Sequence, residues 1–133
     1  MKKEFTEDFK VNVVCEALRT TNVNELFKKY DINKKILDKF IDDLDELEPG
    51  TINALKYDIA ISENLIDKLN ETISKDLNIR QTLINTIELN FQKEKAEAKL
   101  EQVDEQLKSL YSYRSQQQEF LDGAIKELNE LQK

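Results

Sequence analysis

The chain has few side chains of the kinds that usually perform catalysis. Its 133 residues include no histidine and one cysteine, Cys15, so a Ser-His-Asp triad, a Cys-His pair and the usual zinc sites cannot be built. The two glycines, Gly50 and Gly123, lie too far apart to form a glycine-rich phosphate loop. Carboxylates are numerous, but we predict that they lie on solvated helix faces. We therefore expect no enzyme, no metal site and no cofactor.

Cys15 is expected to act as a small buried hydrophobe rather than a reactive thiol, because it lies on the apolar side of a predicted helix beside Leu18. One cysteine cannot form an intrachain disulfide. The apolar stretch 11–18 is interrupted by Asn12 and Glu16, and it is too short for a signal peptide or a membrane span. These features predict a soluble, cytoplasmic protein without a membrane partner.

The composition predicts an all-α protein made of a few long helices. Only two glycines and one proline are present, and hydrophobic and charged residues make up 39% and 35% of the chain. Sheet proteins need turn residues far more often, whereas this balance is typical of coiled coils. The single Pro49-Gly50 pair marks a boundary. We predict a module over residues 1–48 and a long helical coiled-coil arm over residues 49–133.

Three short helices are predicted in the first module. Thr6 is a good N-cap for a helix over residues 7–18; a second helix follows over 23–30, and after a turn at 31–33 a third reaches Leu47. Three short helices with a tight second turn have helix-turn-helix geometry. The apolar residues at helical spacing that would form their common core are Phe9, Val13, Val14, Leu18, Val23, Leu26, Phe27, Tyr30, Ile32, Leu37, Phe40, Ile41 and Leu44.

The arm has no glycine or proline over residues 51–122, and its apolar residues repeat in sevens over two stretches. The rows that we assign to oligomerisation comprise Ile66, Leu69, Ile73, Leu83, Ile87, Leu100, Val103, Leu107, Leu110, Leu121 and Leu128. The two stretches differ in register, so either one long helix absorbs the slip or the chain reverses near residues 90–95. Nearly equal arms, 51–89 and 96–132, favour a helical hairpin. The strong helix formers of residues 92–96 oppose a turn.

The start of the chain also carries a specific pattern: a basic residue, an aromatic followed by Thr, a Phe-Lys pair, and apolar positions at fixed intervals. Its residues are Lys3, Phe5, Thr6, Phe9, Lys10, Val13, Val14, Val23, Leu26, Tyr30, Ile32, Leu37 and Phe40. In this pattern residues 3–47 resemble the helix-turn-helix of the small accessory subunit (OrfA type) of insertion-sequence transposases. Asp31 replaces that family's usual turn glycine, and Phe40 replaces its tryptophan. Asp tolerates left-handed geometry and Phe fills an apolar site, so we expect the core to form.

The resemblance implies that the third helix is a recognition helix whose first turns enter the major groove of DNA. The residues placed there are Asn33, Lys34, Lys35, Asp38 and Lys39, and Lys28 and Lys29 would reach phosphates. Residues 1–39 contain nine Lys or Arg against seven Asp or Glu, whereas residues 40–133 contain eleven against twenty. A surplus of two charges is small for DNA binding, so a dimer or higher oligomer that doubles the contacts would be needed.

Two classes of function follow from these features. The resemblance favours a non-enzymatic DNA-binding homo-oligomer, a dimer in the first instance, that resembles a transposase accessory or regulatory subunit and self-associates through its arm. The net charge of -7 and the acidic end of the third helix favour instead a phage or mobile-element factor that binds another protein, as an inhibitor or assembly scaffold. A structural spacer is a third alternative. Double-stranded DNA binding that weakens with salt would separate the first class from the others.

Overall fold

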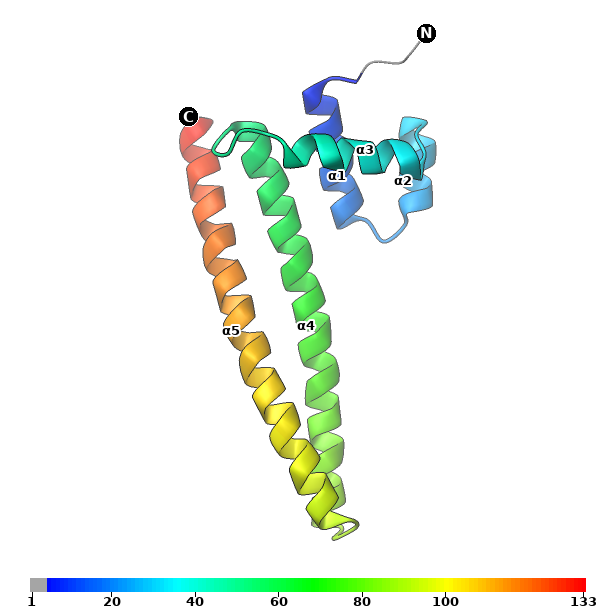
Figure 1. Ribbon diagram of the computed structural model, residues 1–133, viewed down its shortest axis with the longest axis vertical. Coiled ribbons are helices and arrows are strands. Elements are labelled where there is room, and N and C mark those ends of the chain that lie inside the picture. The colour runs from blue at the N-terminus through cyan, green and yellow to red at the C-terminus, as the bar shows by residue number, and fades with distance from the viewer. Residues whose placement is uncertain (1–4) are drawn as a thin grey trace. The chain divides into compact units, whose positions relative to one another are not determined.

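The computed structural model describes residues 5–133, which form five α-helices and no strand. The helices are α1 (Glu7–Arg19), α2 (Val23–Tyr30), α3 (Lys34–Asp45), α4 (Ile52–Glu88) and α5 (Lys93–Leu131) (Figure 1). The all-helical prediction is confirmed for this range; Lys3, which contributes to the family resemblance, lies outside it. None of the described helices is both long and apolar enough to cross a membrane.

Two compact units make up the chain. Of the described residues, the first consists of 5–64 together with 120–133, and the second consists of 65–119. Each of the two long helices therefore contributes residues to both units. The first unit holds the three short helices, and the second holds the C-terminal part of α4 and the N-terminal part of α5 with the turn that joins them.

Side-chain caps fix the starts of the three short helices. Thr6, Asn22 and Asn33 each accept a hydrogen bond from the backbone N–H three residues further on, at 3.1, 3.3 and 2.9 Å. These caps satisfy donors that a helix N-terminus leaves free. The first two helices lie where the sequence places them, to within one residue. The third ends at Asp45, two residues before the predicted end.

Asp31 ends α2 in the left-handed conformation, with φ 54° and ψ 50°. Its backbone N–H and that of Ile32 both donate to the carbonyl of Phe27, the latter at 3.1 Å. This is the conformation in which helices commonly end, usually with glycine. The expectation that Asp31 adopts the left-handed geometry is confirmed, and Ile32 then enters the core at 7% exposure.

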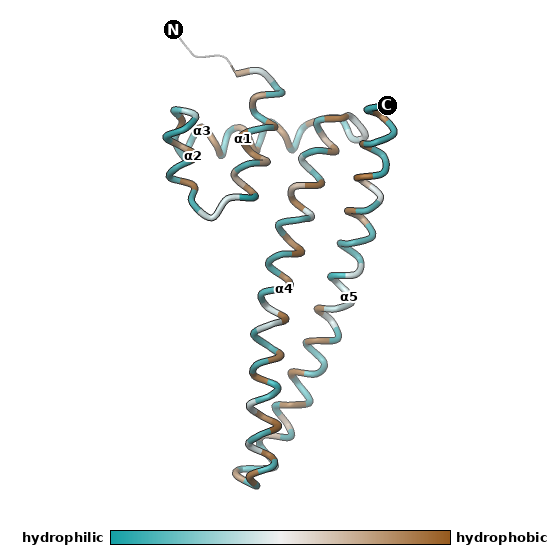
Figure 2. The backbone as a smooth tube through the Cα atoms, turned by 180° about the vertical axis from the view of Figure 1, so that it is seen from behind, coloured by the Kyte–Doolittle hydropathy of each residue, from teal (hydrophilic) through white to brown (hydrophobic). Residues whose placement is uncertain are grey.

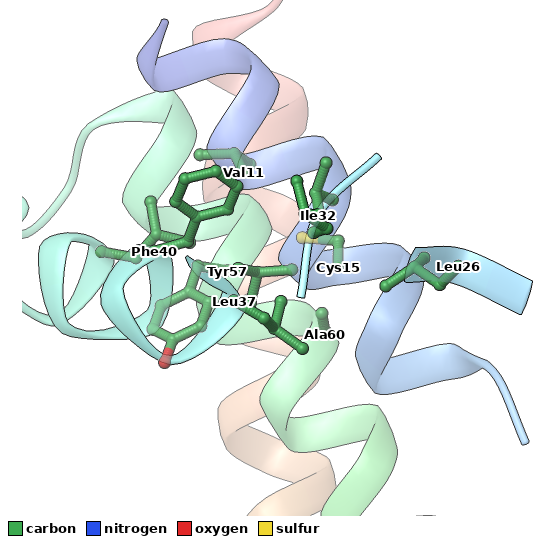
Figure 3. Packing of buried hydrophobic residues seen from close by; sticks show 11 residues of the cluster. Val11, Cys15, Leu26, Ile32, Leu37, Phe40, Tyr57 and Ala60 are labelled. Atoms are coloured by element: carbon green, nitrogen blue, oxygen red, sulfur yellow. The ribbon is translucent and has the colours of Figure 1, made fainter. Parts of the chain in front are cut away.

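The core of the first unit brings α1, α2, α3 and the first turns of α4 together (Figure 3). Its buried members are Val11, Val13, Val14, Cys15, Leu26, Ile32, Leu37, Phe40, Leu44, Tyr57 and Ala60. Tyr57 and Ala60 lie beyond the predicted boundary at residue 48, so the turn at Pro49-Gly50 falls within one packed unit. Gly50 supplies the positive φ of 84° that this turn requires.

An aromatic cluster closes one end of this core. The ring of Phe5 lies 5.0 Å from that of Phe40 in an edge-on arrangement and 5.3 Å from that of Phe9. Phe9 in turn meets the edges of Phe40 and Tyr30 at 6.1 and 5.6 Å. Such edge-to-face contacts add about 0.5–1.5 kcal/mol per pair to simple burial. Phe40 therefore fills the apolar site for which it was predicted.

In the second unit α4 and α5 pack against each other as antiparallel partners. Arg80 of α4 bonds to Asp104 of α5 at 2.7 Å, and Arg114 of α5 bonds to Asn70 of α4 at 2.9 Å. The turn between the helices occupies residues 89–92, with Asn90 at φ 56° and Gln92 at φ 45°. Of the two alternatives for the arm, the chain reversal is therefore confirmed and the single unbroken helix is excluded.

The apolar rows of the arm are covered within a single chain to different degrees. Ile73, Leu107 and Leu121 are buried, and the other residues that we assigned to oligomerisation are half-buried. Figure 2 shows apolar positions recurring along α4, while α5 is mostly hydrophilic. The rows thus contribute to burial inside each chain, and their part in self-association stays a prediction.

Replacing Asp31 with glycine should stabilise the protein by about 1 kcal/mol. A residue with a Cβ loses roughly 1–2 kcal/mol in the left-handed conformation, Asp somewhat less, and glycine avoids this loss. Chemical denaturation would measure the change. The matched control is Asp38→Gly, which removes the same charge from a right-handed helical position and should lower the free energy of unfolding by a few tenths of a kcal/mol. Changes of the same sign in both variants would contradict this account of the turn.

Candidate nucleic-acid interface

The lysines of α3 lie on the side of the helix that faces solvent. Leu37, Phe40 and Leu44 are buried against the core, which fixes the rotation of the helix about its axis. At 3.6 residues per turn the opposite side carries Lys35, Asp38 and Lys39, and Lys34 lies at the border of that side in the first turn; all four are exposed. Packing on one side of α3 therefore leaves these four predicted site residues facing solvent.

Asn33 is occupied in part by its role as a cap. Its Oδ1 accepts the hydrogen bond from the N–H of Ile36, so only the amide NH₂ group is left to donate. The cap starts α3 at Lys34, and the first turn of α3 contains Lys34 and Lys35 but no acidic residue. In contrast, the first turn of α1 carries Glu7 and Asp8.

Lys29 is engaged within the protein. Its Nζ lies 2.9 Å from one carboxylate oxygen of Glu16, and the hydroxyl of Tyr30 donates to the other. These two hydrogen bonds, that from Tyr30 first, hold the pKa of Glu16 below its ordinary value. The contacts clamp the end of α2 to α1, so Lys29 has a structural role in addition to its charge.

The remaining predicted cations have no such partner. Across residues 5–133, none of the ion pairs involves Lys28, Lys34, Lys35 or Lys39, and all four side chains are exposed. Lys28 lies in the last turn of α2 and the other three in the first two turns of α3. The structure thus leaves four predicted site lysines available to an external anion.

Two of the acidic residues near the end of α3 are used inside the protein. Asp43 pairs with Lys10 of α1 at 2.8 Å, and Asp45 accepts a hydrogen bond from the hydroxyl of Tyr57 at 3.0 Å. Asp42 and Glu46 are exposed. The ion pair with Lys10 offsets the charge of Asp43, whereas the neutral hydroxyl of Tyr57 leaves the charge of Asp45 in place. Three of these four carboxylates therefore still oppose an approaching anion.

The Tyr57 hydroxyl was not anticipated, since this residue lies in the segment assigned to the arm. Burial, followed by its hydrogen bond to Asp45, raises the pKa of Tyr57 to about 12. Both effects favour the neutral phenol. A helical spacing of apolar residues at Leu55, Ile59 and Ala60 beside Tyr57 was the available signal that the start of α4 belongs to the core.

Cys15 lies inside the core of the first unit. Cys15 is buried, and its Sγ donates to the carbonyl of Lys56 at 3.6 Å. Burial raises the pKa of this thiol, which keeps it protonated. Over residues 5–133 no cluster of three Cys, Asp or Glu side chains has the arrangement of a metal site.

Comparisons with known proteins add no relative. No family model matches the chain, and neither the curated proteins nor the solved structures contain a match.

Changing Tyr57 to Phe should reduce the loss of stability at high pH. The pKa of this hydroxyl is about 12 in the folded chain and about 10 in an unfolded one. Between these values the unfolded chain releases a proton that the folded chain keeps, so the free energy of unfolding falls as pH rises. Urea denaturation at pH 8, 10 and 11 should show a smaller fall for Tyr57→Phe than for the natural protein. Equal falls would show that the hydroxyl is not protected by folding.

Proposed function

We propose that the first unit binds double-stranded DNA, with α2 and α3 acting as a helix-turn-helix and α3 as the recognition helix. The observation that carries this proposal is the row of exposed, unpaired lysines on α3, Lys34, Lys35 and Lys39. The two short helices, the tight left-handed turn at Asp31 and the packed third helix agree with that geometry. So does the likeness of residues 3–47 to transposase accessory subunits.

The position of the lysines is difficult to explain by stability alone. Cations in the first turn of a helix oppose the helix dipole and cost about 0.3–1 kcal/mol each. Lys34 and Lys35 occupy this unfavourable place, and no carboxylate in the first turn compensates them. The same arrangement adds two side-chain charges to the positive end of the helix, which is where a phosphate is bound best. A phosphate ligand accounts for a placement that folding does not favour.

In this proposal the side chains divide into two roles. Lys28, at the end of α2, contacts the phosphate backbone and sets the orientation of the module. Lys34, Lys35 and Lys39, with the free amide of Asn33, lie along the groove, where they contact phosphates at its rim or acceptors on base edges. Asp38 lies among them and disfavours close approach to phosphate, so it limits the affinity of one copy.

The charge balance sets the expected strength of binding. The four unpaired lysines would neutralise about four phosphates per copy, which predicts a slope of about -3.6 for log K against log salt concentration. That slope corresponds to a loss of roughly 10²-fold in affinity between 50 and 200 mM salt. Binding should therefore be easily measurable at low salt and weak near physiological salt, unless two copies engage one DNA.

The test is the double variant Lys34→Glu, Lys35→Glu in a fluorescence-anisotropy assay with random duplex DNA at several salt concentrations. The natural protein should bind with the salt dependence given above. The variant should bind much more weakly, and its slope should be smaller by at least about 2, because two phosphate contacts are replaced by repulsion.

A charge-matched control is Lys108→Glu, Lys126→Glu on α5, where both side chains are exposed. It makes the same change in net charge and should keep most of the affinity and the slope. Equal losses in the two double variants would mean that only total charge matters. The absence of binding by the natural protein at 50 mM salt would reject the DNA-binding function.

Binding of another protein is the second candidate function, and a specific feature of the second unit favours it. The half-buried Leu100 of α5 has four carboxylates around it, those of Glu97, Glu101, Asp104 and Glu105, and one ammonium group, that of Lys108. An apolar residue with mainly carboxylates around it suits a basic protein surface with an apolar centre, such as the surface of a nucleic-acid enzyme. This function predicts that the DNA assay gives no signal, and that Lys34→Glu, Lys35→Glu leaves partner binding unchanged.

A further inference from the structure

The two sides of the α4–α5 hairpin in the second unit differ in chemistry. On one side two arginines bridge the helices, Arg80 to Asp104 at 2.7 Å and Arg114 to Asn70 at 2.9 Å. The guanidinium of Arg114 also lies 5.0 Å from the centre of the Tyr111 ring. Charged groups, their partners and an aromatic face already occupy this side.

The other side carries a groove of about 490 Å³ between the helices, and a single charged residue lines it. In α5 the groove residue Gln102 is two positions from the bridged Asp104, and therefore about 200° from it around the helix. In α4 the groove residue Ile79 is separated from Leu77 in the same way. The groove thus lies away from the bridged side. Its lining residues are Asn78, Ile79, Thr82, Leu83, Lys99, Gln102, Val103 and Gln106. Only Lys99 is charged, although 35% of the chain is charged, and depletion of charge marks the centre of protein interfaces.

Threonine hydroxyls along this part of α4 are satisfied inside the helix. Thr82 donates to the carbonyl of Asn78 at 3.1 Å, and Thr86 donates to that of Thr82 at 2.9 Å. Such back-bonding removes donors that would otherwise have to be desolvated. The Thr82 hydroxyl therefore needs no further partner when the surface beside Ile79 and Leu83 is covered.

One chain does not complete a core in the second unit. Within residues 65–119 only Ile73, Asp76, Ala96 and Leu107 are buried. Ile79 remains 49% exposed at the edge of the groove. Two helices cannot enclose a core between them, and the usual solution is a bundle of four.

The groove side fits a second copy of itself. An interface across a two-fold axis uses the same patch on both partners, so the patch must offer both a projection and a recess. Ile79 is the projection, and the groove beside Leu83 and Val103 is the recess. Each chain has a net charge of -7, so two copies repel wherever carboxylates face each other. No carboxylate lines the groove, whereas the side around Leu100 has four.

We propose that two copies of this protein associate through the groove side of their hairpins, with Ile79 of each seated in the groove of the other, to form a four-helix bundle. This proposal deepens the proposed function, because a dimer would present twice the number of lysines to DNA. The proposed interface is the groove side of the hairpin rather than the heptad rows, because these rows are already partly buried within each chain. The test of the dimer uses no DNA. The dimer can therefore be disproved while DNA binding holds, and DNA binding can be disproved while the dimer holds.

Sedimentation velocity over a range of micromolar concentrations tests this interface. The natural protein should sediment as a dimer. Ile79→Glu places two carboxylates at the centre of the interface and should raise the dissociation constant at least tenfold, giving a monomer at the same concentrations. The matched control is Leu77→Glu, on the same helix and also exposed, at 44%. It should remain a dimer.

A second variant guards against loss of the fold. Gln102→Glu, Gln106→Glu keeps side-chain size and helix propensity, adds two carboxylates to the groove, and should also weaken the dimer while the helical circular dichroism is unchanged. A natural protein that is monomeric at every concentration would overturn the proposal and leave the groove to a different helical partner. Dimers that survive both groove variants, or that Leu77→Glu disrupts equally, would overturn it as well.

Discussion

Burial of the Phe40 ring is the constraint on which the first unit depends. This side chain is 2% exposed and meets the rings of Phe5 and Phe9. Because α3 has to turn this ring inward, its rotation is set, and the polar side of the helix has to face water. The lysines of α3 are thus displayed by packing on the far side of the helix. A surface function and a core residue are coupled through the geometry of a single short helix.

Which charged side chains are paired inside the protein matters more for its surfaces than the total number of charges. Lys10, Arg19 and Lys29 of the first unit are tied to carboxylates on neighbouring helices, while the lysines of α3 are not. In the second unit the two arginine bridges lie on one side of the hairpin, and no carboxylate lines the groove on the other side. Both surfaces that we assign to binding therefore depend on where the ion pairs and arginine bridges form. The lysines of α3 have no carboxylate partner, and the arginine bridges lie away from the groove.

The sequence predicts the elements well and the contacts between them poorly. Helix starts at Thr6, Asn22 and Asn33 follow from local capping chemistry, and few glycines leave few places for a helix to end. The exposure of the site lysines also follows, because the apolar spacing of α3 fixes its inner face. Partners such as Asp43 for Lys10 or Asp45 for Tyr57 could not be predicted, since no local signal joins residues so far apart. The difference between the two sides of the hairpin could not be predicted either. A repeat of seven identifies the apolar rows but not the residues on either side of them.

Asp76 gives the second unit a built-in weak point. It is buried between the helices, and its Oδ2 finds no hydrogen-bond partner in residues 5–133. A buried carboxylate oxygen without a donor costs about 1–3 kcal/mol, and a helix pair with so small a core can offset little of this. The hairpin should therefore open locally around this position. The backbone amide hydrogens there should exchange with solvent hydrogen long before those near Phe40. Opening at Asp76 would involve residues that contribute nothing to the core around Phe40.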